Sequence, residues 1–78
     1  MKNAAQSREI GQYKSEIQYL KEAIKVSDEN KLPKSLDYIG IHNNIGVAYG
    51  KLGKYEKATN KFIEALEIYY QNMGLELH

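Results

Sequence analysis

The sequence contains an internal repeat in which matching residues lie 42 positions apart. IGQYKSEIQYLKEAIKV (residues 10–26) aligns with LGKYEKATNKFIEALEI (residues 52–68). The identical pairs are Gly11 and Gly53, Tyr13 and Tyr55, Glu22 and Glu64, and Ala23 and Ala65. The pairs that keep an apolar character are Ile10 and Leu52, Leu20 and Phe62, Ile24 and Leu66, and Val26 and Ile68. Repeated units of about 20–50 residues bury their apolar sides against their neighbours, so this pattern favours a stack of similar units.

Apolar or aromatic residues spaced alternately three and four positions apart predict a first amphipathic helix, which we expect to end near Asp28. They are Ile10, Tyr13, Ile17, Leu20 and Ile24. The segment NKLPK (residues 30–34) then interrupts the pattern. Pro33 cannot occupy a helix interior and it disfavours helical angles at Leu32, so we predict a loop here.

Two further helices are predicted after this loop. The second starts at Ser35, which can act as its N-cap, and stops at Gly53; its stripe is Tyr38, Ile41, Ile45, Ala48 and Leu52. The third runs from about Tyr55 to Met73, with Tyr55, Ala58, Phe62, Ala65, Tyr69 and Met73 on one face. Because no alternating strand pattern is present, the chain is predicted to be all-α.

The residues of the second and third helices resemble the signature of the tetratricopeptide repeat, a helix–turn–helix unit. The matching residues are Ile45, Gly46, Tyr49, Gly53, Tyr55, Ala58, Phe62 and Ala65. The resemblance implies antiparallel helix hairpins stacked into a short right-handed α-solenoid fragment with three main helices. The separation of 42 residues exceeds the usual repeat length of about 34, which is typical of a variety with longer helices.

The first unit matches this family less well. Glu16 stands where the pattern has a small residue, and Asn3, Ala4 and Ser7 replace a large apolar residue, a small residue and a tyrosine. We therefore divide the chain into four segments: 1–10, an eroded or truncated first helix unless it continues into the next; 11–34, the second helix of a partial repeat plus a loop; 35–73, a complete repeat; and 74–78, a tail.

One side of the second helix is a candidate binding surface. It consists of Gly40, Asn43, Asn44, Val47, Gly50 and Lys51, which turn away from the apolar stripe. The resemblance implies that this face lines a concave groove for ligands. Small residues would let a peptide backbone come close, and the two asparagine amides could hydrogen-bond it in both directions. In the alternative interpretation Gly50 only loosens the last helical turn and Gly40 is only tolerated.

Gly46 has a different predicted role, because it lies at the edge of the apolar stripe. There the missing side chain would let the partner helix approach closely.

The third helix has more apolar surface than one neighbour can cover. Ile63, Leu66 and Tyr70 widen its apolar face to about 160°, which indicates a docking surface for another repeat. Two ways of covering this apolar surface remain open. The chain is part of a longer solenoid, or it forms a homo-oligomer by pairing copies through these faces, with or without exchange of helices. Self-association would also stabilise a chain of 78 residues without cysteine.

Other classes of function are disfavoured by composition and motifs. The charges nearly balance, with 11 Lys plus Arg against 10 Asp plus Glu, and they form no basic stripe, so nucleic acid is not an expected partner. No apolar run is long enough to span a membrane, and residues 1–10 lack the apolar centre of a signal peptide, which makes the cytoplasm the default compartment. No catalytic or phosphate-binding motif, cofactor site or metal-ligand pattern is present. His42 is expected to be a packed or surface residue, not a catalytic base.

These observations predict a protein–protein interaction module that binds a peptide, a helix or a copy of itself. The alternative hypothesis is a purely structural domain that self-assembles, as a homodimer or by helix exchange, without a separate ligand. The sequence does not indicate the identity of the partner.

Overall fold

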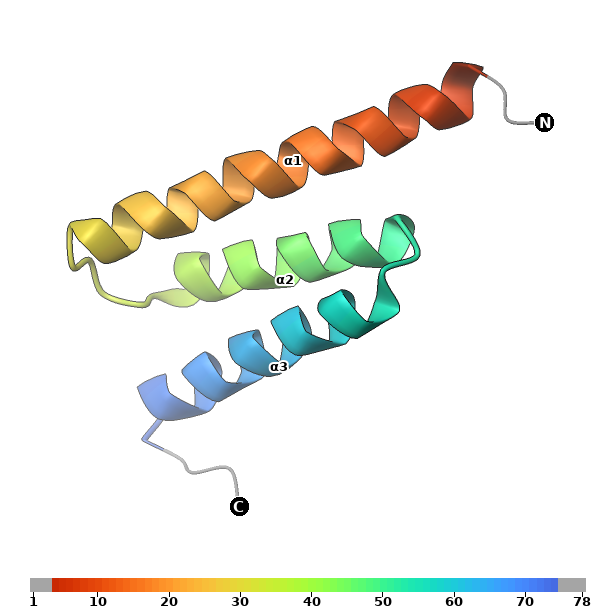
Figure 1. Ribbon diagram of the computed structural model, residues 1–78. Coiled ribbons are helices and arrows are strands. Elements are labelled where there is room, and N and C mark those ends of the chain that lie inside the picture. Colours follow the sequence, from red (N-terminus) through yellow and green to blue (C-terminus); the bar gives the residue numbers. More distant parts are fainter. Residues whose placement is uncertain (1–3, 75–78) are drawn as a thin grey trace.

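The computed structural model describes residues 4–74, and these form three helices joined by two short connections (Figure 1). The helices are α1 (Ala4–Glu29), α2 (Leu36–Lys51) and α3 (Tyr55–Asn72). Within the described residues, α1 and α3 each pack on α2 and not on each other. The predicted all-α fold with three main helices is confirmed.

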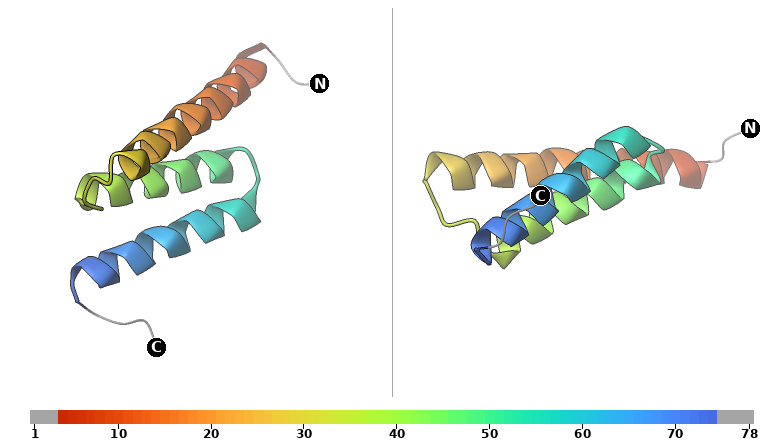
Figure 2. Two further views of the ribbon diagram at one scale, coloured as in Figure 1. Left: turned by 60° about the vertical axis from the view of Figure 1, so that its left-hand side comes forward. Right: turned by 90° about the horizontal axis from the view of Figure 1, so that it is seen from below.

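Helix α1 runs without a break from Ala4 through the predicted boundary between residues 10 and 11. Residues 4–9 therefore extend this helix, while residues 1–3 and 75–78 lie outside the described part of the chain. Because α1 is the longest helix, its N-terminal end projects beyond the turn between α2 and α3 (Figures 1 and 2). It ends where Lys31 adopts a positive φ of 53°, before the loop that contains Pro33.

The turn between α2 and α3 depends on Gly53. This residue has a φ of 77°, which a residue without Cβ adopts without steric cost. The following backbone N–H, from Lys54, donates to the carbonyl of Tyr49 at 2.9 Å and closes the end of α2. At the other end of α2, Ser35 is the N-cap residue as predicted, but its side chain makes no capping hydrogen bond with the described residues. The carboxylate of Asp37 lies in that first turn instead, where a negative charge is favoured by the helix dipole.

The core follows both sides of α2. One cluster of buried residues is Ile17, Ile45, Ala48, Tyr49 and Ala58, and the other is Tyr38, Ile39, Ala65 and Ile68. Ile24 of α1 packs against both clusters, and Ile45 is 0% exposed. The single stripe predicted for α2 is therefore incomplete: Ile41 and Leu52 are only half-buried, whereas the off-stripe Ile39 is buried. A helix with neighbours on two sides needs two apolar faces.

The predicted packing face of α3 is partly wrong. Ala58 and Ala65 are buried as expected, but Tyr55 and Met73 are 72% and 57% exposed, and Ile68 is buried in addition. The other two predicted members, Phe62 and Tyr69, are 41% and 40% exposed. The reason is that, among the described helices, α3 packs on α2 alone and touches it along one edge of the predicted stripe.

The two halves of the internal repeat pack on α2 with different faces. Helix α1 uses Tyr13, Ile17, Leu20 and Ile24, whose counterparts 42 positions later are the exposed Tyr55, Thr59, Phe62 and Leu66. Helix α3 uses Ala58, Ala65 and Ile68, whose counterparts in α1 are Glu16, Ala23 and Val26, outside both core clusters. The two outer helices therefore use largely different faces against α2, although Phe62 of α3 also contacts Gly46.

Candidate functional site

The proposed groove face of α2 is an open surface of the described chain. Asn43, Asn44, Val47 and Lys51 are exposed, and Gly40 and Gly50 are half-buried. A Cβ atom added at Gly40 or Gly50 would meet no described heavy atom within 4 Å, apart from the immediate helix backbone. These two glycines are therefore not required by the packing of the three helices.

Gly46 has a different environment, against the ring of Phe62. A Cβ atom at Gly46 would lie 2.7 Å from Cε1 and 2.9 Å from Cδ1 of that ring, which is closer than carbon atoms normally pack. The missing side chain thus lets Phe62 rest directly on the α2 backbone. This contact sets the close approach of α2 and α3.

A hollow of about 270 Å³ opens between α2 and α3 beside this contact. Its lining residues are Ile39, Asn43, Phe62, Ala65, Leu66 and Tyr69, and none of these described residues is charged. The hollow brings together Asn43, which the sequence placed in the groove, and Leu66, which the sequence placed on a separate docking face. An exposed amide thus stands at the rim of an apolar depression.

The open face of α3 is broader than predicted. Ile63 and Leu66 are each 47% exposed, and Tyr70 is half-buried with its ring edge-on to Tyr69, 5.9 Å between centroids. The other exposed large apolar side chains here are Tyr55, Phe62 and Tyr69 of the helix and Met73 directly after it. Sequence reasoning missed them as surface residues because it had assigned them to the core.

His42 is buried on the other side of α2, below a shallow hollow of about 370 Å³ between α1 and α3. It is 4% exposed, and neither ring nitrogen has a hydrogen-bond partner among the described residues. Its Nδ1 lies 3.6 Å from a carboxylate oxygen of Glu64. Burial lowers the pKa of His42, and the nearby charge of Lys61 lowers it further, whereas Glu64 raises it. The ring is therefore a neutral part of the core.

Tyr38 joins α1 to α2 close to this histidine. Its hydroxyl donates to Oδ1 of Asp28 at 2.9 Å, and its ring lies 5.1 Å from that of His42. Burial, with the hydrogen bond to Asp28, raises the pKa of Tyr38 to about 12. The hydroxyl therefore keeps its proton and holds the last turn of α1 on α2.

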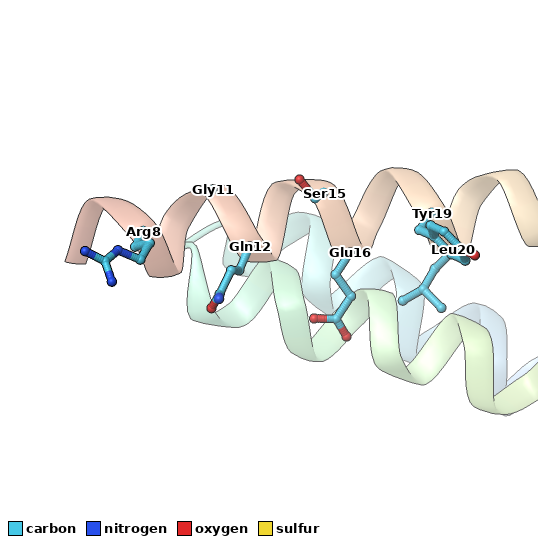
Figure 3. A pocket seen from close by; sticks show the side chains of 7 residues that line it. All are labelled: Arg8, Gly11, Gln12, Ser15, Glu16, Tyr19 and Leu20. Carbon is cyan, nitrogen blue, oxygen red and sulfur yellow. The ribbon is translucent and has the colours of Figure 1, made fainter. Parts of the chain in front are cut away.

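The outer face of α1 carries two shallow concavities that the sequence analysis did not identify. The first, of about 680 Å³, is lined by Arg8, Gly11, Gln12, Ser15, Glu16, Tyr19 and Leu20 (Figure 3). The second, of about 530 Å³, is lined by Tyr19, Glu22, Ala23, Val26, Ser27 and Leu32. The internal repeat was the signal that could have indicated this face.

Two further properties concern the described residues as a whole. Residues 4–74 hold no group of three or more acidic or histidine side chains arranged to bind a metal ion. In the same part of the chain, every helix is too short or too polar to cross a membrane.

Comparison with known proteins identifies the α2–α3 hairpin. The family model described as "Tetratricopeptide repeat" matches residues 39–72, from the first turn of α2 to the last residue of α3. Comparisons with curated proteins and with solved structures found no significant match. The matched segment contains all eight signature residues, with Gly46 against Phe62 and Gly53 in the turn. The α2–α3 hairpin of residues 39–72 therefore matches a tetratricopeptide repeat, as the signature residues predict.

Proposed function

We propose that the chain is a protein-interaction module that binds a peptide or helix of another protein along the groove face of α2 and into the α2–α3 hollow. The observation that carries this proposal is the position of Asn43, exposed at the rim of a hollow whose other walls include Phe62 and Leu66. Tetratricopeptide repeats generally mediate contacts between proteins, so the surface fits the family's general role.

The chemistry of the surface suggests how such a segment binds. A large apolar side chain of the partner enters the hollow, where burial contributes about 1.5–3 kcal/mol. The Asn43 amide donates to and accepts from the partner's backbone, while Gly40 and Gly50 leave room for that backbone to come near. Each element supplies a different part of recognition, namely affinity from the hollow and orientation from the amide.

A catalytic role has no comparable support. The family generally provides scaffolds. The ring nitrogens of His42, the histidine among the described residues, are buried and cannot reach a substrate from their present position.

The test is a substitution that fills the rim of the hollow. A peptide ligand is first selected against the full chain from a random phage-displayed library, and its affinity is then measured by isothermal titration calorimetry. Asn43→Arg is expected to leave the helical circular dichroism unchanged and to abolish binding, because the longer, charged side chain would occupy the entrance. Gln18→Arg is the matched control, since it adds the same charge at an exposed position of α1. A folded Asn43→Arg variant that binds with unchanged affinity would contradict the proposal.

A second candidate is self-assembly without a separate ligand, favoured by the exposed apolar face of α3. Leu66 is 47% exposed on this face. If copies pair through it, sedimentation equilibrium of the wild-type chain gives a dimer or larger species, and Leu66→Asp converts it to a less stable monomer. A wild-type chain that stays monomeric at every concentration would exclude this candidate.

A further inference from the structure

Helix α3 ends in a left-handed turn at Gly74. This glycine follows the C-cap residue Met73 and has a φ of 74°. Its backbone N–H donates to the carbonyl of Gln71 at 3.1 Å, and that of Met73 donates to the carbonyl of Tyr69 at 3.1 Å. Such a glycine, bonded back into the last helical turn, is typical of a Schellman motif. In that motif the residue after the glycine frequently packs against an apolar side chain near the end of the helix.

The residues after this glycine carry the apolar side chains that such a contact needs. Segment 75–78 has the sequence LELH and lies outside the described part of the chain. Leu75 comes directly after the glycine, at the position of the apolar contact. Because alternate side chains of an extended segment point to the same side, Leu75 and Leu77 would share one side and Glu76 would take the other.

Distances along α3 match the reach of this segment. The contact of Leu75 falls on the last turn of α3, which begins at Tyr69. An extended residue advances about 3.3 Å, so Leu77 lies up to about 10 Å from Gly74. A helix rises about 1.5 Å per residue, which places Leu66 about 12 Å back from Gly74 along the helix axis. A segment that runs back along α3 can therefore bring the Leu77 side chain to the stretch between Tyr69 and Leu66.

Two hollows flank α3, and their chemistry differs. The charged residues that line the hollow toward α1 are Asp28, Lys34, Lys61, Glu64 and Glu67. The α2–α3 hollow has no charged residue in its described lining, and Phe62, Leu66 and Tyr69 are 41%, 47% and 40% exposed there. Leucine side chains gain stability when apolar surface is removed from water. The α2–α3 hollow is therefore the one that suits this segment.

We propose that segment 75–78 folds back along α3, packs Leu75 on the last helical turn and covers the α2–α3 hollow with Leu77. The hollow then has two competing occupants, namely this segment of the same chain and the peptide of another protein. The contact itself needs no partner, whereas the competition rests on the function proposed above. Segment 75–78 thereby sets the fraction of chains whose binding surface is open.

A spin label in the segment tests the contact in the absence of any peptide. The sequence has no cysteine, so His78→Cys provides a single attachment site for a nitroxide on the full chain. We expect the label to broaden the amide signals of Asn43, Phe62 and Leu66 in ¹⁵N-labelled protein, because the folded-back segment brings it beside the hollow. Unchanged intensities at these three residues, relative to the chemically reduced label, would overturn the proposal.

A mixture of two chains separates this contact from one between copies. The ¹⁵N-labelled wild-type chain is mixed with an equal amount of spin-labelled His78→Cys chain that carries no ¹⁵N. The signals of Asn43 and Leu66 are expected to keep their full intensity. Loss of intensity in the mixture would also overturn the proposal, because segment 75–78 of one copy would then lie on another copy.

A charge placed in the segment tests the competition. Leu77→Asp is expected to tighten binding of the phage-selected peptide about two- to tenfold, since the apparent affinity rises with the fraction of chains whose hollow is open. His78→Asp is the matched control, because it adds a negative charge at the neighbouring position, and it is expected to leave the affinity unchanged. Circular dichroism checks that both variants keep their helices.

Unchanged or weaker peptide binding by Leu77→Asp would overturn the competition. If the wild-type chain and Leu77→Asp both bind no peptide, the proposed function fails, while the spin-label experiment still decides whether segment 75–78 covers the hollow. The two proposals therefore fail in distinguishable ways.

Discussion

Replacing Gly46 by alanine is expected to destabilise the protein, although alanine is the better helix former. The added Cβ would lie 2.7 Å, 2.9 Å and 3.1 Å from three carbon atoms of the Phe62 ring. Overpacking of this kind costs about 1–3 kcal/mol, and the gain in helix propensity offsets about 0.5–1 kcal/mol of that cost. Phe62 is 41% exposed, so its ring can swing outward and relieve part of the clash. We therefore expect a net loss of about 1 kcal/mol.

The same substitution elsewhere in α2 is the matched control. Gly40→Ala and Gly50→Ala place their Cβ atoms in open space, so each is expected to stabilise the chain by about 0.5–1 kcal/mol. One chemical change within one helix thus has opposite signs at different positions. A free-energy change of about 1 kcal/mol corresponds to about 4–8 °C in Tm for a domain of this size.

The assay is urea and thermal unfolding followed by circular dichroism at 222 nm for the three single variants. A Phe62→Ala background adds a decisive comparison, because Gly46→Ala should become stabilising once the ring is absent. If Gly46→Ala raised the stability of the wild-type chain as much as Gly50→Ala does, the proposed contact between Gly46 and Phe62 would be refuted.

Two further predictions concern the buried core. Because burial lowers the pKa of His42 below its ordinary value of 6.5, the unfolded chain takes up a proton before the folded chain does, and the free energy of unfolding should fall as the pH drops below about 6.5. His42→Leu should weaken this dependence in urea titrations at about pH 7.5 and 5.5, and an unchanged pH dependence would count against a neutral buried ring. Ala65→Arg places a charge at a position that is 2% exposed, where the cost of several kcal/mol exceeds the roughly 3–5 kcal/mol available to so small a core. Its circular dichroism should show loss of the α2–α3 hairpin, and a helical variant with wild-type Tm would contradict the packing described for α3.

The helices were predictable from sequence because local signals define them. Pro33 and Gly53 interrupt the chain, and spacings of three and four residues place apolar side chains on one side of each helix. How the helices pack against one another was harder to predict from the sequence. Periodicity assigns a face to each helix but does not say how many neighbours that helix has, so the second buried side of α2 at Ile39 was missed and Tyr55 was assigned to a core it does not reach.

The candidate site was predictable only in part, for the same reason. Asn43 and Leu66 were each named from the sequence, but as parts of separate surfaces, and only the packing of α3 on α2 places both at one hollow. The burial of His42 beside Glu64 depends on residues 22 positions apart, 64 minus 42, that no local pattern connects. The outer face of α1 could be recognised only from the internal repeat and the structure together. The repeat relates α1 to α3, and the structure shows which of their faces are covered.

The most direct test of the proposed function is an amide NMR map of the ¹⁵N-labelled full chain, recorded with and without the selected peptide ligand. If the proposed function is right, the largest shift changes lie at Asn43, Phe62 and Leu66, which line the α2–α3 hollow. Shift changes that leave these three residues unaffected would contradict it, whichever other part of the chain responds.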